Sequence, residues 1–379
     1  MIRFDGVTKQ YPDGTVAVDD LSLTAPTGKI TVLVGPSGCG KTTSLRMVNR
    51  MIEPTRGSIF LDGQDTGRMD QAELRRGIGY VIQHAGLFPH RTVLDNIGTV
   101  PRLLGWDRKK VHDRSRELIE RVGLDAHLGD RYPAQLSGGQ QQRVGVARAL
   151  AADPPVMLMD EPFSAVDPVV RDQLQDEFLR LQDELGKTIV FVTHDIDEAV
   201  KLGDQVAVLR VGGTLAQVAE PAYLLAHPAD DFVADFVGRD RGYRALQFQP
   251  TPRLPLRPEP TVVIGETPEH RASWLLVVDD DRHPLGWVEP ARLAGRAVED
   301  ADLHRGGTVA RADGSLRGAL DAALSSPSRR GVVVDGSGSL VGTVLAHEVL
   351  SAIEDTDRPE RDEADPVRGG AMSVAGDEA

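Results

Sequence analysis

A glycine-rich run between an apolar segment and a helical pattern constrains this chain more than any other feature. It reads Val34-Gly35-Pro36-Ser37-Gly38-Cys39-Gly40-Lys41-Thr42-Thr43. Its glycines let the backbone curl so that successive amides point inward, and the following helix adds partial positive charge at its N-terminus. Lys41 is placed to reach the β and γ phosphates, and the Thr42 hydroxyl to ligate Mg²⁺. A plain glycine-rich turn is the alternative, but the full spacing in this context predicts a phosphate-binding loop.

Two carboxylates follow a second apolar segment. Asp160 and Glu161 come directly after residues 156–159. Asp160 at a strand end can hold the shell of a Mg²⁺ ion, and Glu161 can polarise an attacking water. Such a pair is a weak signal alone, because most are solvated strand ends. Together with the phosphate loop it predicts hydrolysis of a nucleotide.

The first 240 residues alternate short β-branched runs with longer helical patterns, which predicts a parallel sheet with crossover helices. Residues 30–34, 156–159 and 188–192 are the clearest buried strands, and 102–132 is typical of an inserted helical subdomain. The 43 basic and 57 acidic side chains leave a net charge of −14, which disfavours a nucleic-acid partner. Because Cys39 is the only cysteine, no intramolecular disulfide can form.

Beyond residue 244 the composition changes. Five prolines between 250 and 260 predict an extended linker over 245–260. Asp279 and Gly286 recur as Asp335 and Gly342, a constant offset of 56 residues, which predicts a tandem repeat of a small α/β unit. The acidic stretch 354–379 is expected to be disordered. No run of 18 apolar residues occurs, so we expect a chain that is neither secreted nor membrane-spanning, although docking on an integral membrane partner stays open.

A second anion-binding signal precedes a helical pattern. Ser137-Gly138-Gly139-Gln140 follows Leu136 and opens that helix, where exposed amides can meet a phosphate. One nucleotide needs only one phosphate loop, so this site calls for another partner. Here the sequence resembles the ATP-binding cassette (ABC) family, whose signature is Leu-Ser-Gly-Gly-Gln. The resemblance implies a homodimer in which the signature of one subunit closes on the γ-phosphate held by the other, with ATP and Mg²⁺ as ligands.

Four further residues match the family in order. Tyr11 lies where the family stacks an aromatic ring on adenine. Gln83 resembles the glutamine that touches Mg²⁺ and the water, and Asp167 belongs to a loop similar to one that crosses the dimer interface, with Val166 replacing the usual leucine. His194 resembles the switch histidine that hydrogen-bonds the γ-phosphate. The family therefore assigns catalysis to Glu161, His194 and Gln83, and metal binding to Thr42, Gln83 and Asp160.

Over residues 1–244 the resemblance narrows to importers of glycine betaine, carnitine, choline or proline. Short runs carry it, for example Tyr11-Pro12-Asp13-Gly14-Thr15 and His194-Asp195-Ile196-Asp197-Glu198-Ala199. It implies a peripheral ATPase on the cytoplasmic side of the cell membrane, bound to integral permease subunits that work with an extracytoplasmic solute-binding protein. Leu87-Phe88-Pro89-His90 offers apolar groups where such cassettes receive a short permease helix. An importer of an unrelated solute, such as an amino acid or polyamine, and a non-transport ABC ATPase are the alternatives.

The expected fold class is α/β, a P-loop cassette with a parallel-sheet core, an antiparallel β subdomain and a helical subdomain, over residues 1–244. The repeat over 261–353 is similar to the cystathionine-β-synthase (CBS) pairs that often follow such cassettes. In those pairs a Thr or Ser and an Asp three residues later bind adenosine, but Glu289 with Arg292 and Leu345 with Glu348 stand here. We therefore expect a degenerate regulatory pair. For Cys39, the inward amides beside Lys41 favour a reactive thiolate, with a shielded thiol as the alternative.

Overall fold

The protein divides into two compact units. The structure, a computed structural model, describes residues 1–83, 85–164, 166–251, 254–269 and 272–356. The first unit is Met1–Gly242 and the second Tyr243–Ala379, so the division falls two residues before the expected boundary at 244.

A mostly parallel sheet of six strands forms the centre of the first unit. Its strand order is β10-β9-β3-β8-β7-β6, and β10 alone pairs antiparallel in this sheet. Every residue of β3, β7 and β8 is buried, as expected for strands covered on both faces. The strands are β3 (Ile30–Val34), β6 (Ile78–Val81), β7 (Val156–Asp160), β8 (Thr188–Val192), β9 (Gln205–Leu209) and β10 (Leu215–Ala219).

An antiparallel sheet packs beside it, in the order β2-β1-β4-β5. One buried core joins the two sheets and includes Phe4 and Leu21 from the antiparallel sheet with Leu33, Leu158 and Val190 from the parallel one. The strands are β1 (Ile2–Gln10), β2 (Val16–Ala25), β4 (Arg56–Leu61) and β5 (Gln64–Asp65). The predicted cassette architecture of a parallel core with an antiparallel subdomain is therefore confirmed.

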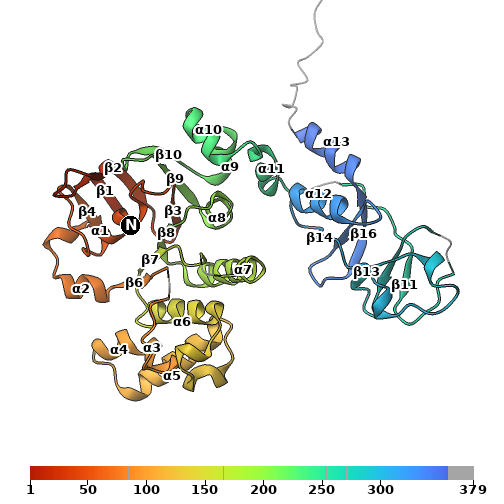
Figure 1. Ribbon diagram of the computed structural model, residues 1–379, viewed down its shortest axis with the longest axis horizontal. Helices are drawn as coiled ribbons and strands as arrows, with labels where there is room; N and C mark the ends of the chain where they lie inside the picture. The colour runs from red at the N-terminus through yellow and green to blue at the C-terminus, as the bar shows by residue number, and fades with distance from the viewer. Residues whose placement is uncertain (84, 165, 252–253, 270–271, 357–379) are drawn as a thin grey trace, which may run out of the picture. The chain divides into compact units, whose positions relative to one another are not determined.

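Helices cover the parallel sheet and extend from one end of it. Figure 1 shows α7 and α8 on one side of the central strands, with α1 and the antiparallel sheet on the other, and α3 to α6 grouped below β6 and β7. The predicted helical insert is thus present. The helices of this unit are α1 (Lys41–Val48), α2 (Gln71–Arg76), α3 (Val93–Ile97), α4 (Thr99–Leu103), α5 (Arg108–Arg121), α6 (Gly138–Leu150), α7 (Pro168–Leu185), α8 (Ile196–Leu202), α9 (Pro221–Ala226) and α10 (Asp231–Val237), with α11 (Arg241–Ala245) at the division.

The second unit contains two small sheets of the same design, each with a parallel pair followed by an antiparallel strand. The offset of 56 residues relates β12 to β15 and β13 to β16, but β14 begins only 48 residues after β11 (309 against 261). The difference arises because the connection between β14 and β15 contains α12, whereas the described residues between β11 and β12 form no helix. The elements are β11 (Thr261–Val263), β12 (Leu275–Val278), β13 (Pro284–Val288), β14 (Val309–Arg311), α12 (Leu316–Ser325), β15 (Arg330–Val334), β16 (Leu340–Leu345) and α13 (Ala346–Thr356).

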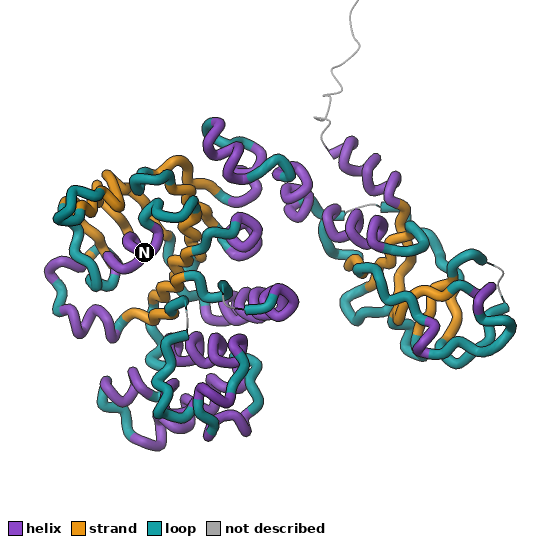
Figure 2. Tube along the Cα trace, viewed as in Figure 1, coloured by secondary structure: helices purple, strands orange, loops and turns teal. Residues whose placement is uncertain are grey.

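The proline-rich segment is extended but belongs to the second unit. Pro250 forms a bridge with Ser315, Arg257 forms one with Thr343, and Leu254 packs on the core of the second repeat. The described residues of the predicted linker therefore pack on the second unit. The prediction of disorder is wrong for residues 354–356, because α13 continues to Thr356. The rest of the acidic stretch lies outside the described residues. Figure 2 shows the helices and strands of both units. Short 3-10 turns lie at Thr66–Arg68, Ala126–Asp130, Pro133–Gln135, Leu246–Phe248, Pro290–Arg292 and Asp300–Asp302.

Candidate nucleotide-binding site

The glycine-rich run forms a tight loop between β3 and α1. Gly40 has a φ of 87°, in the left-handed region that favours glycine, and a Cβ there would lie 2.1 Å from the carbonyl oxygen of Ala17. Gly38 also has a positive φ, of 80°, but a Cβ on it would meet nothing within 4 Å. Packing thus requires a glycine at position 40, whereas at position 38 only the backbone conformation favours one. The loop is open to solvent or ligand beside Gly38.

The N-terminus of α1 has no side-chain cap, although Asp70 caps α2, Thr92 caps α3 and Asp107 caps α5. Its first amides are therefore available to an anion. Lys41 is buried and its Nζ donates to the carbonyl oxygens of Gly35 at 2.7 Å and Pro36 at 3.1 Å. These donors are the type that the phosphates of ATP require, so the loop fits the predicted ligand.

A hydroxyl and a carboxylate lie together beside the loop. Thr42 Oγ1 donates to Asp160 Oδ1 at 2.8 Å. Burial raises the pKa of Asp160, while the hydrogen bond from Thr42 and the positive charge of Arg46 oppose that shift. Two adjacent oxygen ligands suit Mg²⁺, which usually takes one or two protein groups together with phosphate and water. Among the described residues there is no group of three or more His, Cys, Asp or Glu side chains that could hold a metal ion.

Three expected catalytic residues meet at the same edge of the sheet. Glu161 Oε2 accepts a hydrogen bond of 3.1 Å from Gln83 Nε2, and Glu161 Oε1 lies 3.2 Å from His194 Nδ1. The three residues follow neighbouring parallel strands, β6, β7 and β8, whose carboxyl ends share one edge. That edge is where ligands bind in open α/β sheets.

The backbone of Glu161 is held in an uncommon conformation. Its φ of 46° lies in the left-handed region, and its amide donates to the carbonyl oxygen of Val192 at 2.9 Å. A non-glycine residue there is destabilised by about 1 kcal/mol or more, so the neighbouring strand must hold it. Such conformations cluster at functional sites.

The signature residues lie elsewhere in the same unit. Ser137 is exposed and caps α6, with Gln140 N donating to its Oγ at 3.3 Å and Ser137 N donating to Gln140 Oε1 at 2.9 Å. These partners belong to the helix itself and not to the phosphate loop. Figure 1 places α6 in the helical group and α1 beside the antiparallel sheet. Ser137, Gly138, Gly139 and Gln140 therefore stand apart from the cluster around Glu161.

Tyr11 and Asp167 come from two other segments of the same unit. Tyr11 opens the turn after β1, where the amide of Gly14 donates to its carbonyl oxygen at 3.0 Å and the Lys9 ammonium lies 5.4 Å from the ring centre. Asp167 is exposed at the start of α7. The sequence reasoning did not single out Arg171, whose Nη2 donates at 3.1 Å to the carbonyl oxygen of Val166. In the sequence, Arg171 is marked only by its place in the first turn of the helix that follows Asp167.

Cys39 differs from the expected reactive thiol. The side chain is completely buried in the loop, and burial raises the pKa of the thiol despite the nearby charge of Lys41. The desolvation of a thiolate outweighs the attraction of one ammonium group that also bonds two carbonyls. The expectation of a favoured thiolate is therefore wrong, and the shielded alternative describes the residue.

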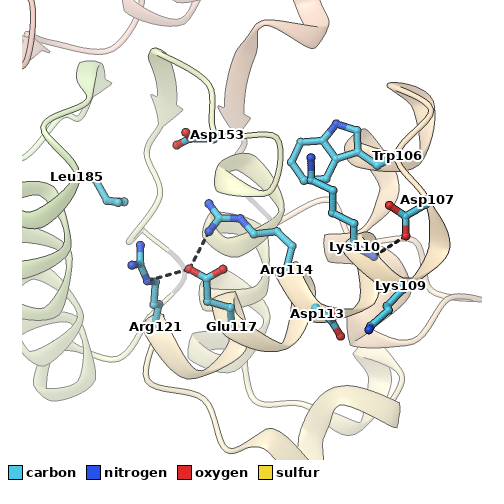
Figure 3. Close-up of a pocket in the computed structure, with 10 residues that line it drawn as sticks. All are labelled: Trp106, Asp107, Lys109, Lys110, Asp113, Arg114, Glu117, Arg121, Asp153 and Leu185. Atoms are coloured by element: carbon cyan, nitrogen blue, oxygen red, sulfur yellow. Dashed lines mark hydrogen bonds and ion pairs between the residues drawn. The ribbon is translucent and has the colours of Figure 1, made fainter.

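A groove of about 750 Å³ lies along α5, away from this cluster (Figure 3). Four cationic side chains line it, Lys109, Lys110, Arg114 and Arg121, but so do four carboxylates, Asp107, Asp113, Glu117 and Asp153. Figure 3 shows Glu117 between Arg114 and Arg121, paired with both. The charges balance, so this groove has no excess of positive charge for a phosphate.

Comparisons with known proteins agree with this geometry. Residues 18–164 match the family described as ABC transporter. The osmoprotectant import ATP-binding protein OsmV of Salmonella typhimurium is 44% identical over 359 residues, covering 91% of this chain and 94% of OsmV. The glycine betaine/carnitine/choline transport ATP-binding protein OpuCA of Bacillus subtilis is 42% identical over 372 residues, covering 94% of this chain and 97% of OpuCA.

A solved structure resembles the first unit. It is a dimeric, post-hydrolysis state of the ATP-binding cassette MJ0796 with ADP and Pi, 33% identical, with a TM-score of 0.53, and it covers 58% of this chain and 99% of that one. Among the described residues, none of the helices combines the length and apolar character needed to cross a membrane. With relatives matched over almost their whole length, the chain belongs to the ABC transporter ATP-binding proteins and is an ATPase.

Proposed function

We propose that this chain hydrolyses ATP to power the uptake of a quaternary ammonium osmoprotectant such as glycine betaine, carnitine or choline, or of proline. The cluster of Gln83, Glu161 and His194 beside the Thr42–Asp160 pair carries the ATPase part of the proposal. The near full-length identity to relatives named for osmoprotectant, glycine betaine, carnitine and choline transport supports the solute class. No residue of the cassette is assigned to the solute.

In this proposal the loop from Gly35 to Thr43 holds the phosphates of ATP. Lys41 exchanges its contacts with the Gly35 and Pro36 carbonyls for the β and γ phosphates, and the uncapped amides of α1 donate to the same oxygens. Tyr11 stacks on the adenine ring. Thr42, Asp160 and Gln83 would hold a Mg²⁺ ion, which when bound neutralises charge on the phosphate oxygens.

Glu161 acts on the water that attacks the γ-phosphorus. Its carboxylate takes a proton from the water as the new P–O bond forms, while the bond from phosphorus to the bridging oxygen breaks and leaves ADP. Gln83 and His194 already touch the two oxygens of this carboxylate, so they orient it. Because His194 contacts Glu161 through Nδ1, its Nε2 is available to the γ-phosphate. Binding of that phosphate would therefore affect the position of the same carboxylate.

The active form in this proposal is a homodimer. The signature residues of the chain do not meet its own phosphate loop, and the resembling cassette structure is dimeric. Ser137, Gly138, Gly139 and Gln140 of one subunit then complete the site of its partner, with Asp167 at the interface between them. The exposed side chain of Ser137 is consistent with that role.

The permease would dock on a groove of about 250 Å³ beside β6. It is lined by apolar groups that include Phe88 and Val100, and by Arg75, Arg76 and Arg148. Phe88 is 40% exposed, with the Arg91 guanidinium 4.9 Å from its ring centre, so part of the ring is available to a partner. We place the chain on the cytoplasmic side of the membrane, as a peripheral subunit of a transporter with an extracytoplasmic solute-binding protein.

The second unit is proposed to regulate and not to catalyse. At the positions where CBS pairs bind adenosine, Glu348 instead accepts hydrogen bonds from its own Leu345 amide at 3.0 Å and from Arg257, and Glu289 pairs with Arg292 at 2.9 Å. These internal partners support a degenerate CBS-like pair over 261–353 that lacks the usual adenosine contacts.

The test is reconstitution with the permease and the solute-binding protein in vesicles, with ATP on the cassette side. Uptake of labelled glycine betaine, carnitine, choline or proline should require ATP and should disappear in the Glu161→Gln transporter. Uptake of an amino acid other than proline or of a polyamine alone would favour the unrelated-solute alternative. A cassette that does not assemble with any permease would favour a non-transport ATPase.

A further inference from the structure

Arg148 joins the signature helix to the loop that follows Gln83. From α6 its Nη1 donates to the carbonyl oxygen of Gly86 and its Nη2 to that of Ala85, both at 2.6 Å. A single planar guanidinium therefore binds two successive carbonyls, the fork geometry that lysine cannot reproduce. Burial lowers the pKa of Arg148.

The loop needs this support. Ala85 and Gly86 both have left-handed backbones, with φ of 52° and 54°, and alanine adopts that conformation only at an energetic disadvantage. The helix backbone also touches the loop, because a Cβ on Gly145 would lie 3.5 Å from Ala85 atoms. Ala85 is buried against α6. Helix and loop are thus held together by two hydrogen bonds and by close packing.

The same helix reaches the signature motif. Ser137 caps the N-terminus of α6, and Arg148 lies eleven residues further on, about 16 Å along a continuous α-helix. An α-helix of this length moves as one body. Arg148 also lines the groove with Phe88 and Val100, so a partner in that groove would lie against the loop that Arg148 holds.

We propose that Arg148 is a positioning residue that makes the loop at Ala85 and Gly86 move together with the signature helix α6. Binding of the permease in the groove would then change the position of Ser137. This inference rests on the proposed permease partner. Without the guanidinium, the loop can shift without moving the helix. The chemistry at Glu161 stays intact, because Arg148 touches none of the residues assigned to it.

Arg143 provides a matched control. It lies on the same helix and, like Arg148, donates to two successive carbonyl oxygens. Both bonds come from Nη1, to Val122 at 3.0 Å and to Gly123 at 2.8 Å. These two hydrogen bonds reach only the turn that follows α5, and Arg143 does not line the groove with Phe88. Replacing either arginine removes two similar hydrogen bonds, but only Arg148 joins α6 to the loop.

The experiment compares ATP hydrolysis by the full-length cassette alone and assembled with its permease, for wild type, Arg148→Met, Arg148→Lys and Arg143→Met. We expect Arg148→Met to lose most of the stimulation by the permease, on the order of tenfold, as for other couplings between sites. Its unstimulated rate and its KM for ATP should stay within about twofold, since the catalytic groups are untouched. Arg143→Met should keep the stimulation, and Arg148→Lys should lose part of it.

Two outcomes would overturn the inference: full stimulation of Arg148→Met, or equal losses in Arg148→Met and Arg143→Met at equal thermal stability. If Arg148→Met does not fold, Arg148→Lys decides, because wild-type stimulation in that variant contradicts a bidentate role. The readout is a ratio to wild type and needs no solute, so an error in the solute class leaves it unaffected. A wild-type cassette that no permease stimulates would instead contradict the proposed function.

Discussion

The phosphate loop of the first unit and the helix cap and buried ion pair of the second differ in what their polar groups bind. In the first, Lys41 donates to two main-chain carbonyls and to the Cys39 thiol, and α1 has no side-chain cap hydrogen bond among the described residues, so a phosphate can take over these donors. In the second, Ser315 caps α12, and the buried Glu259 pairs with Arg330 at 3.1 Å and accepts from Thr343 at 3.0 Å. Groups that already have side-chain partners are not available for a ligand, whereas donors that can exchange their partners are.

The sharpest way to test the first half of this contrast is Glu161→Gln. The change removes the proton acceptor but leaves the phosphate loop in place, so hydrolysis should fall by about 10²-fold to 10⁴-fold. ATP binding should be nearly unchanged. Phosphate release and nucleotide binding measure the two effects, with the exposed Glu184→Gln as a control. Turnover within twofold of wild type would remove Glu161 from this role.

A mixed dimer tests whether the signature works across the interface. Combining Lys41→Ala and Ser137→Arg chains should leave one site with both lesions and one intact, with up to about half of the wild-type hydrolysis rate. Each variant alone should be almost inactive. If both lesions act within their own chain, the mixed dimer will be as inactive as its parents. Hydrolysis by tagged, purified mixed dimers gives the answer.

For the second unit, Glu259→Gln should affect stability and not turnover. Its side chain is only 3% exposed, and burial raises its pKa despite the charge of Arg330, so the carboxylate is disfavoured in the folded state. The neutral amide keeps an acceptor for Thr343, so we expect the free energy of unfolding to rise by up to about 1 kcal/mol. ATP hydrolysis should stay within about twofold of wild type, since no catalytic group is touched. Calorimetry of the full chain measures the stability, and exposed Glu266→Gln is the control. A large loss of hydrolysis would contradict a purely structural pair.

The smallest expected effect is a pH dependence in the second unit. His283 Nδ1 lies 3.0 Å from Asp279 and its Nε2 lies 3.2 Å from the carbonyl oxygen of Ser337, which joins the turns of the two repeats. The hydrogen bond to Asp279 raises the pKa of His283 above 6.5, so the protonated form is favoured in the folded state. This contribution is complete below pH 6.5 and is lost as the pH rises through the raised pKa.

Calorimetric scans from below pH 6.5 upward should therefore show the second unit losing stability over that interval. His283→Gln should flatten the profile, while hydrolysis at the first unit should show no matching change. The charged neighbours of the imidazole are Asp279 and Asp281. The amide of His283 lowers the pKa of Asp279, so that carboxylate stays ionised over this interval. An unchanged profile in His283→Gln would exclude this residue as the source.

Much of the nucleotide site can be predicted from local sequence, because its groups follow strand ends. Residues 30–34 and 188–192 are strands as expected, and Asp160 and Glu161 stand at the edge that parallel pairing creates. Arg148 could not be found in this way. Its partners lie some sixty residues away, and an arginine in a helix between buried alanines gives no local sign of what it binds.

The sequence by itself determined the family, the phosphate loop and the positions of the clearest buried strands, since each depends on residue types at short spacing. The tertiary structure alone decided three other features. It buried Cys39 and so reversed the expected shift of its pKa, it packed the proline-rich segment onto the second repeat, and it brought Arg148 to the loop after Gln83. Each depends on which distant groups exclude water from a side chain or supply its hydrogen bonds, and local spacing does not contain that information.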